Sequence, residues 1–396
     1  MMQISPETQL FISEHSSDDV HTLALQAKKY PDIDMPTAIT QIAGRKVAAE
    51  KIPSWWKIEK IWYPKHLSLE QCSSEITARY KARLLQGDSL TDLTGGFGID
   101  CSFLATGFKS ATYVERQEEL CEIAAHNFPV LNLNHINIRN EDGVTYLQAM
   151  SPVDCLFLDP ARRNEHGGKT VAISDCEPNV AELEELLLHK ANRVMIKLSP
   201  MLDLSLALKE LKHTQEVHIL SVNNECKELL ILLGQTSPTE ISIHCVNLST
   251  KGTQEEQHFV FTREQEQCSE CTYTDSLETY LYEPNASLLK AGAFRSIAAA
   301  YPVRKLHPNS HLYTSDTFIE NFPGRIFRIV NQCSFNKKEV KENLADLKKA
   351  NVTVRNFPAT VAELRKRIHL AEGGDTYLFA STLNNGQKVL IRCEKV

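Results

Sequence analysis

The segment DLTGGFGID, residues 92–100, places two acidic side chains around a group of glycines. Gly95, Gly96 and Gly98 allow a tight turn and let a ligand approach the backbone with no Cβ in the way. A Walker phosphate loop would continue with lysine and serine or threonine, but isoleucine and aspartate follow the last glycine here. The segment therefore predicts a ligand-binding loop that is not a Walker loop.

The acid at the start of this loop, Asp92, indicates the charge of the ligand. A carboxylate is unfavourable beside a pyrophosphate, and Cys101 stands where a dinucleotide fingerprint has its third glycine. An acid suits a ligand that carries positive charge, such as the amino and sulfonium groups of S-adenosylmethionine. The loop therefore favours this cofactor over a dinucleotide.

Three further acids follow the next predicted strands in order. Glu115 ends the second strand, 23 residues after Asp92 (115 − 92), where an acid can accept hydrogen bonds from both ribose hydroxyls. Asp142 follows the third strand, in a position to meet an adenine amino group, and Asp159-Pro160 ends the fourth, where a methyl group would be delivered. The alternatives are a helix N-cap for Asp142 and a solvated strand end for Glu115.

Short apolar runs that alternate with amphipathic helices must position these acids. Such alternation predicts βαβ units and a parallel sheet buried on both faces. Only NNECK separates the last two runs, so they must pair as an antiparallel hairpin. We predict a doubly wound, Rossmann-like α/β sheet with a reversed last strand, and the runs are 90–93, 111–115, 135–140, 154–159, 193–199, 217–222 and 228–234.

The remaining chain divides into regions of different character. Residues 1–65 read as a helical N-terminal region, and the main domain is expected over 66–263, with two extra strands at its end. Residues 264–324 read as a linker and an irregular helical segment. Residues 325–396 predict a small α/β domain of order βαβαββ, with Asn385-Gly386 as its hairpin turn.

Four motifs, DLTGGFGID, YVE, NEDG and LFLDPARR, resemble motifs I to IV of class I S-adenosylmethionine-dependent methyltransferases. The run ELLILLG is similar to their reversed seventh strand, and the resemblance covers roughly residues 66–235. A threonine replaces the first glycine of the usual motif I, as in several RNA-modifying members. The resemblance implies a seven-stranded sheet and S-adenosylmethionine as the cofactor, bound by Asp92, Thr94, Gly95, Gly96, Gly98, Glu115 and Asp142.

Two outer segments extend the resemblance to a bacterial branch of these enzymes. The stretch EPNASLLKAGAF (283–294) and the C-terminal unit are similar to the THUMP-like domain of that branch. Residues 67–82 also resemble this branch, which implies a position over the methionine end of the cofactor. A capped amphipathic helix is the alternative for residues 67–82.

The tetrapeptide DPAR resembles the Asn/Asp-Pro-Pro motifs used for nitrogen methylation, and it implies Asp159, Pro160 and Arg162 as catalytic candidates. An alanine replaces the second proline, and no aromatic residue follows to stack on a flipped base. Arg162 and Arg163 suggest contacts with phosphate or a guanine edge; two solvated loop arginines are the alternative. We expect residues 163–170 to form a lid that orders on substrate binding.

Lys197 and a basic segment near the C-terminus are candidates for substrate binding. Lys197 ends the fifth strand at the same rim, where it would meet substrate or form a salt bridge. Residues 335–369 hold nine Lys or Arg and four acids, a difference of +5 in a chain of net charge −7. This predicts an RNA anchor that includes Arg355, Arg365 and Arg367, although a solvated helix face is the alternative. THUMP-type domains are linked to structured RNA.

Together these patterns predict that the protein is a methyltransferase that modifies a base in tRNA or rRNA. The alternatives are a methyltransferase for DNA, protein or a small molecule, and a non-catalytic RNA-binding protein. No signal peptide or long apolar segment is present, which predicts a cytoplasmic protein with no membrane partner. Cys268 and Cys271 form a lone CxxC, so no structural metal is expected. The oligomeric state is left open.

Overall fold

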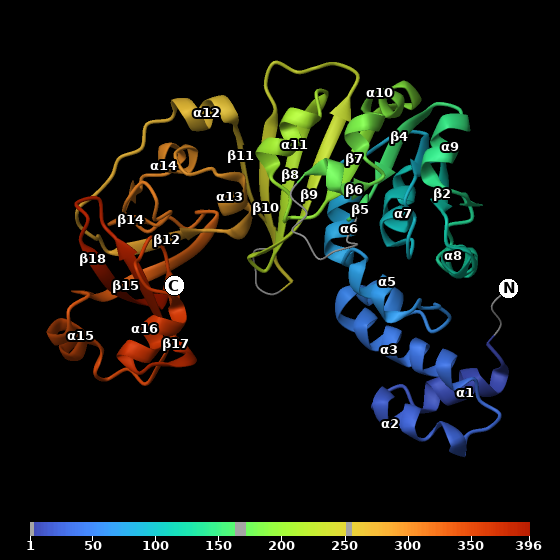
Figure 1. Ribbon diagram of the computed structural model, residues 1–396, viewed down its shortest axis with the longest axis horizontal. Helices are drawn as coiled ribbons and strands as arrows, with labels where there is room; N and C mark the ends of the chain where they lie inside the picture. The colour runs from blue at the N-terminus through green and yellow to red at the C-terminus, as the bar shows by residue number, and fades with distance from the viewer. Residues whose placement is uncertain (1–3, 163–171, 251–255) are drawn as a thin grey trace. The chain divides into compact units, whose positions relative to one another are not determined.

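The computed structural model describes residues 4–162, 172–250 and 256–396. Two compact units divide the chain: residues 1–215 with 229–238, and residues 216–228 with 239–396 (Figure 1). Within the described residues, no helix has the length and apolar character needed to cross a membrane.

Helices form the start of the first unit, as the sequence predicts. Three of these helices begin at side-chain caps, in which Ser5, Asp19 and Asp34 each accept a hydrogen bond from a backbone N–H three residues later. The helices are α1 (Pro6–Glu14), α2 (Val20–Leu25), α3 (Met35–Lys51), α4 (Pro53–Trp56), α5 (His66–Gln71) and α6 (Glu75–Ala82), with the 3₁₀ helix η1 (Ala27–Lys29) between α2 and α3.

A mostly parallel sheet follows, with helices between its strands. The strands are β1 (Ser89–Asp92), β2 (Ser110–Glu115), β3 (Ile136–Asn140), β4 (Val153–Leu158), β7 (Ala191–Leu198) and β9 (Glu225–Gly234). The helices are α7 (Ile99–Leu104), η2 (Ala105–Gly107), α8 (Glu118–Val130), α9 (Gly143–Ala149), η3 (Ile173–Asp175), α10 (Val180–Lys190) and α11 (Leu204–Glu210), and a small ribbon joins β5 (Ala161–Arg162) to β6 (Cys176–Glu177).

The strand order confirms the predicted Rossmann-like sheet. It is β11-β10-β8-β9-β7-β4-β1-β2-β3, so the described residues form nine strands of this sheet, two beyond the seven of the predicted core. β1 runs parallel to both β2 and β4, and β4 runs parallel to β7. β9 runs antiparallel to β7 and is the predicted reversed strand. The carboxyl ends of β1, β2, β4 and β7 therefore meet at one edge, where ligands bind in such sheets.

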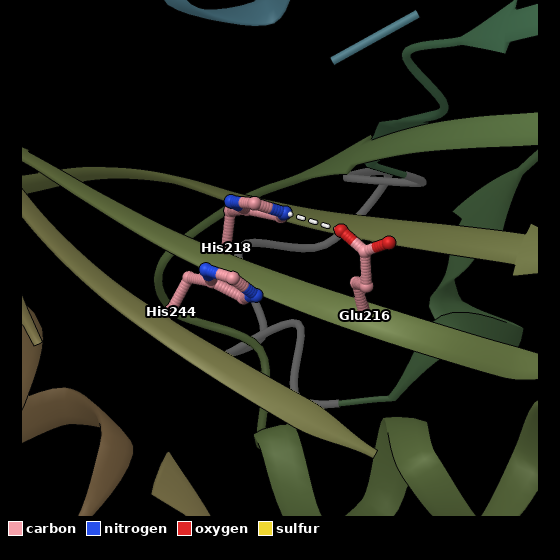
Figure 2. Close-up of side chains that lie close together, drawn as sticks. All are labelled: Glu216, His218 and His244. Carbon is pink, nitrogen blue, oxygen red and sulfur yellow. Dashed lines mark hydrogen bonds and ion pairs between the residues drawn. The ribbon is translucent and has the colours of Figure 1, made fainter. Parts of the chain in front are cut away.

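In the second unit, β8 (Thr214–Val222), β10 (Ser242–Leu248) and β11 (Glu256–Thr262) form one end of this sheet. β8 and β10 are parallel, and their register places His218 beside His244. Figure 2 shows these two rings beside the carboxylate of Glu216. β10 and β11 are antiparallel.

The C-terminal part folds into a seven-stranded sheet of order β13-β14-β12-β15-β18-β17-β16. β12, which precedes the predicted small domain, pairs antiparallel with β15. The elements are α12 (Arg263–Cys268), β12 (Tyr280–Pro284), α13 (Ala286–Ala291), α14 (Ser296–Ala300), β13 (Arg304–Lys305), β14 (Tyr313–Ser315), β15 (Gly324–Ser334), α15 (Lys337–Leu344), β16 (Lys349–Val354), α16 (Val361–Ile368), β17 (Ala371–Thr382) and β18 (Lys388–Lys395).

An apolar cluster in the first unit fixes the N-terminal helices against the glycine loop. Phe97, from the loop, packs edge-on against Trp55 with ring centroids 5.2 Å apart, and Tyr63 lies beside it. Leu69 of α5 belongs to the same cluster. Burial of such large side chains stabilises the segment by roughly 2 kcal/mol each. The segment between α5 and α6 is thereby held beside the carboxyl end of β1.

Candidate active site

Asp92 lies at the end of β1 and is buried, with 1% of its surface exposed. Its Oδ1 accepts a hydrogen bond from the backbone N–H of Thr94 at 2.9 Å. Its Oδ2 is buried and has no hydrogen-bond partner within the parts of the chain that the structure describes. Burial, together with the nearby carboxylates of Asp100, Asp159 and Glu115, raises the pKa of Asp92 to about 8.

The glycines of the loop adopt the conformation that the sequence predicts. Gly96 and Gly98 have φ values of +54° and +84°, which L side chains rarely adopt. At Gly95, a Cβ would come within 2.2 Å of the Tyr113 ring. All three positions therefore require glycine, and α7 begins directly after the last of them.

Glu115 at the end of β2 is part of the same edge. Its Oε2 accepts a hydrogen bond from the backbone N–H of Gly96, and its Oε1 accepts one from Gln117, each at 2.8 Å. Only 8% of Glu115 is exposed, so it is no solvated strand end. A carboxylate has about four acceptor positions, and two are occupied here. The carboxylate is thus oriented and keeps acceptor capacity for a ligand.

Asp142 is exposed and caps α9. Its Oδ1 accepts hydrogen bonds from the backbone N–H groups of Val144 and Thr145 at 3.1 and 2.9 Å. The structure therefore shows the N-cap that the sequence left as an alternative. Contact with an adenine remains a prediction for this residue.

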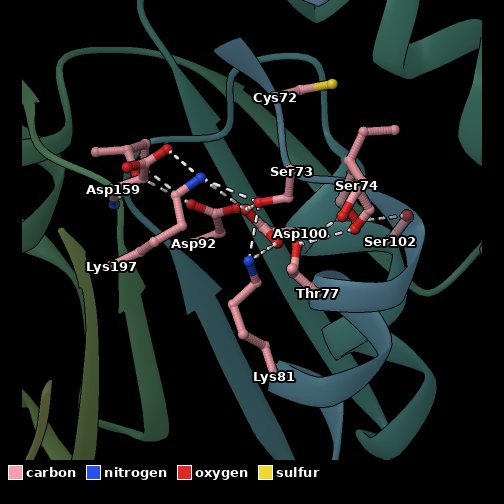
Figure 3. Close-up of polar contacts among 12 residues, drawn as sticks. Cys72, Ser73, Ser74, Thr77, Lys81, Asp92, Asp100, Ser102, Asp159 and Lys197 are labelled. Carbon is pink, nitrogen blue, oxygen red and sulfur yellow. Dashed lines mark hydrogen bonds and ion pairs between the residues drawn. The ribbon is translucent and has the colours of Figure 1, made fainter. Parts of the chain in front are cut away.

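A buried ionic cluster lies beside Asp92 and joins α6, α7, β4 and β7 (Figure 3). Lys81 Nζ lies 3.0 Å from Asp100 Oδ1, and Lys197 Nζ lies 3.3 Å from Asp100 Oδ2. Ser73 Oγ donates to Asp100 at 2.7 Å and accepts from Lys81 at 2.8 Å and from Lys197 at 3.1 Å. Lys197 also lies 2.6 Å from Asp159 Oδ2.

Lys81 and Lys197 keep the Asp100 carboxyl group in its ionised form. Lys81 is fully buried and Asp100 nearly so. Burial alone would raise the pKa of Asp100, but the lysine charges and the Ser73 hydroxyl hold that pKa well below its usual range. Asp100 is therefore ionised, and its charge is neutralised from both sides within the protein.

The candidate catalytic residues follow β4. The backbone N–H of Asp159 donates to Thr94 Oγ at 2.6 Å, which links the end of β4 to the glycine loop. Pro160 is buried, and Arg162 lies in β5, paired with Cys176. Arg163 and the lid predicted over 163–170 lie outside the described residues.

The predicted RNA-binding arginines take part in contacts inside the second unit. Arg355 pairs with Glu283 at 3.1 Å, and Arg365 lies 3.9 Å from Glu372 with 17% of its side chain exposed. Arg367 is exposed and lies over the Phe335 ring at 4.1 Å. The structure does not bring these arginines together into one open surface.

The sequence predicts Asp92, Thr94, Glu115 and Asp159 at one edge, and the structure brings them together. It does not predict Ser73, Lys81 and Asp100 as members of the cluster, and it leaves Lys197 as a substrate contact or a salt bridge. The repeated polar residues of SSEITARYK and the second acid of the glycine segment were the available signals. Neither signal shows which residues pair with each other, because the contacts of the cluster join separate elements of the chain.

A crystal structure of a protein called a "putative methyltransferase", from Porphyromonas gingivalis W83, is similar over the whole chain. The sequences are 34% identical, the match covers 100% of both chains, and the TM-score is 0.88. Residues 280–323 match the family described as a ferredoxin-like domain, and residues 324–395 match the family described as THUMP domain-like.

Two other solved structures match part of the chain. An rRNA methylase from Streptococcus thermophilus is 14% identical, covering 40% of this chain and 93% of its own, with a TM-score of 0.29. TrmK from M. capricolum, in complex with S-adenosylhomocysteine, is 12% identical, covering 41% and 68%, with a TM-score of 0.32. No curated protein matches the sequence.

Proposed function

The chain belongs to the methyltransferase family of the Porphyromonas gingivalis protein, and we propose that it uses S-adenosylmethionine to methylate a base in structured RNA. The observation that carries the cofactor assignment is the buried Oδ2 of Asp92, which has no hydrogen-bond partner among the described residues. A buried carboxylate oxygen without a partner is costly, so a cationic ligand group is its expected complement.

The residues around Asp92 fit the cofactor's chemical groups. The amino group of the methionine end would neutralise Asp92, and Glu115 would accept hydrogen bonds from the ribose hydroxyls. At Gly96 the backbone is open for close approach, because a Cβ there would meet only the Thr94 carbonyl oxygen, at 3.8 Å. Gly98 supplies the left-handed turn, with φ of +84°. Asp142 is the candidate for the adenine contact, alongside its role as the cap of α9. When bound, S-adenosylmethionine supplies an electrophilic methyl group on its sulfonium.

The residues at the end of β4 are the candidates for holding the acceptor. Asp159 is anchored through its backbone N–H to Thr94 and through its side chain to Lys197. A group held in this way can keep an acceptor nitrogen in line with a donor, and such positioning supplies much of the rate enhancement in group transfer. Asp159, Pro160 and Arg162 remain our candidates for this role.

Exposed lysines of the C-terminal domain favour RNA as the acceptor. Arg355 and Arg365 are engaged in ion pairs, so the anchor proposed here consists mainly of exposed lysines on and beside α15 and α16. These are Lys337, Lys338, Lys341, Lys348, Lys349 and Lys366. Such side chains bind phosphates without regard to base sequence. The match to the THUMP domain-like family agrees with this proposal.

Mass spectrometry of RNA nucleosides tests the proposal as a whole. A strain that lacks the gene should lose one methylated nucleoside from tRNA or rRNA. The wild-type gene should restore it, and an Asp92→Asn gene should not. Unchanged nucleosides in both RNA classes would contradict RNA as the acceptor, and DNA, protein or a small molecule would then be the acceptors to examine.

A further inference from the structure

Three potential metal ligands meet on one face of the sheet in the second unit. Glu216 and His218 lie two residues apart on β8, so their side chains share a face. The register with β10 places His244 directly beside His218. One ligand atom from each of the three lies within 4.8 Å of the others, and Figure 2 shows the two imidazole rings side by side with the Glu216 carboxylate next to His218.

The contacts among these side chains are already close. His218 Nε2 lies 3.2 Å from Glu216 Oε2, and the His218 and His244 rings are stacked with centroids 4.3 Å apart. His218 is buried, while about a third of the Glu216 side chain is exposed. Part of the Glu216 side chain is therefore open to solvent, and the pairing of β8 with β10 fixes the backbone of all three residues.

Two imidazoles and a carboxylate form a donor set suited to Zn²⁺ and similar divalent transition metals. With metal–ligand bonds of about 2.0–2.1 Å, tetrahedral ligands stand about 3.3 Å apart. The His218–Glu216 separation of 3.2 Å already matches this spacing.

His258 on β11 supplies the orienting contact that metal-bound histidines usually have. Its register partner is Val246, two residues after His244 on β10, so it shares the same face. His244 Nδ1 lies 3.1 Å from His258 Nε2. A donated Nδ1–H would leave the Nε2 lone pair of His244 for a metal.

We propose that Glu216, His218 and His244 bind one divalent transition metal ion, with Zn²⁺ as the physiological ion, and that His258 orients His244. Three protein ligands leave one position for water. The ion joins β8 to β10 and stabilises the second unit. The site is independent of the methyl-transfer site and of its proposed cofactor.

Co²⁺ binding to the untagged full-length protein, freed of metal with a chelator, tests this site. We expect one Co²⁺ per chain, visible d–d absorption, displacement by Zn²⁺, and a Zn²⁺-dependent rise in melting temperature. Glu216→Gln and His244→Asn should each weaken binding by at least about tenfold. His21→Ala, at an exposed histidine of α2, and the pair Cys268→Ser and Cys271→Ser should leave binding unchanged.

A measurement on the wild-type protein covers the case in which a variant fails to fold. Zn²⁺ should protect the peptide that contains His244 from histidine modification by diethyl pyrocarbonate, as read by mass spectrometry. Protection confined to other histidines would overturn the proposal. So would the absence of stoichiometric Co²⁺ binding, unchanged binding in folded Glu216→Gln, or a sulfur-to-cobalt charge-transfer band that the cysteine variant abolishes.

Discussion

Lys197 Nζ lies 2.6 Å from Asp159 Oδ2, so an ion pair joins the ends of the neighbouring strands β7 and β4. The same Nζ lies 3.3 Å from Asp100 Oδ2, which ties this pair to the glycine loop and α7. The sequence offered Lys197 as a substrate contact or as a salt-bridge partner at the strand end, and the structure shows the salt bridge. Asp159, a proposed acceptor contact, is therefore held by the ionic cluster that lies beside the proposed cofactor site.

Lys197→Met should lower methyl transfer while affecting cofactor binding far less. Without the ion pair, Asp159 loses its fixed position, and a displacement of about 1 Å in such a site reduces rates by roughly 100-fold. Steady-state kinetics give kcat, and calorimetry with S-adenosylhomocysteine gives Kd. Lys197→Arg, which keeps the charge, should recover part of the rate. Equal loss of kcat and of affinity would show that Lys197 acts mainly on the cofactor.

Lys81→Met should destabilise the protein strongly. Lys81 is fully buried and pairs with Asp100, so its removal leaves a buried carboxylate with one cationic partner fewer. Breaking such a pair from one side costs about 3–5 kcal/mol of the free energy of unfolding, measured by chemical denaturation. Lys109→Met is the matched control, since its pair with Asp88 is exposed and contributes little. Similar small losses in both variants would refute a structural role for the buried cluster.

Binding of S-adenosylhomocysteine should release protons through Asp92. Because its pKa in the free protein is raised to about 8, Asp92 is largely protonated at pH 7. A cationic amino group favours the ionised form, so affinity should rise as pH increases from about 6 to 8. Calorimetry in buffers of different ionisation enthalpy measures this release. Asp92→Asn should bind weakly and show no such release; full affinity in that variant would contradict the assignment.

The stability of Asp92→Asn separates lost binding from misfolding. The folded pKa of Asp92 lies above its unfolded value, so its contribution to stability is complete at low pH and is lost as pH rises toward about 8. Asparagine cannot ionise, and the variant should therefore melt higher than the wild type at pH 8. A lower melting temperature would indicate that the substitution damages the fold.

RNA affinity should depend steeply on salt and on the exposed lysines of the C-terminal domain. Counterion release makes phosphate binding weaken as salt increases, and each lost contact reduces the slope by about one. Lys337→Glu with Lys338→Glu, and separately Lys348→Glu with Lys349→Glu, should weaken binding in a filter assay. Lys28→Glu with Lys29→Glu, on exposed lysines of η1, is the charge-matched control. Equal weakening of RNA binding in all three variants would contradict the assignment of the C-terminal lysines as the RNA anchor.

The fold was largely predictable because strands buried on both faces appear as continuous apolar runs. The predicted strand 154–159 corresponds to β4, and the predicted reversed strand corresponds to β9. Residues 337–350 have a continuous helical pattern, yet α15 ends at Leu344, because residues from Lys349 onward join β16 and Ala350 is buried there. Helical periodicity alone does not reveal that tertiary pairing.

The candidate site was predictable where one strand end supplies one acid. Asp92 and Glu115 follow parallel strands, so their meeting at one edge follows from the topology. The pair of Lys81 with Asp100 and the histidine group around His244 depend on contacts between separate elements. A lysine on a polar helix and histidines spread over three strands give no periodic signal, so their partners emerge only from the packing.

Transfer of a labelled methyl group tests the central claim most directly. Wild-type protein, S-[methyl-³H]adenosylmethionine and RNA from a strain lacking the gene are incubated, with DNA and protein fractions of the same strain in parallel. We predict label in RNA that ribonuclease releases and that Asp92→Asn does not incorporate. Label only in DNA or protein, or no label in any fraction despite cofactor binding, would contradict the assignment of this chain as an RNA methyltransferase.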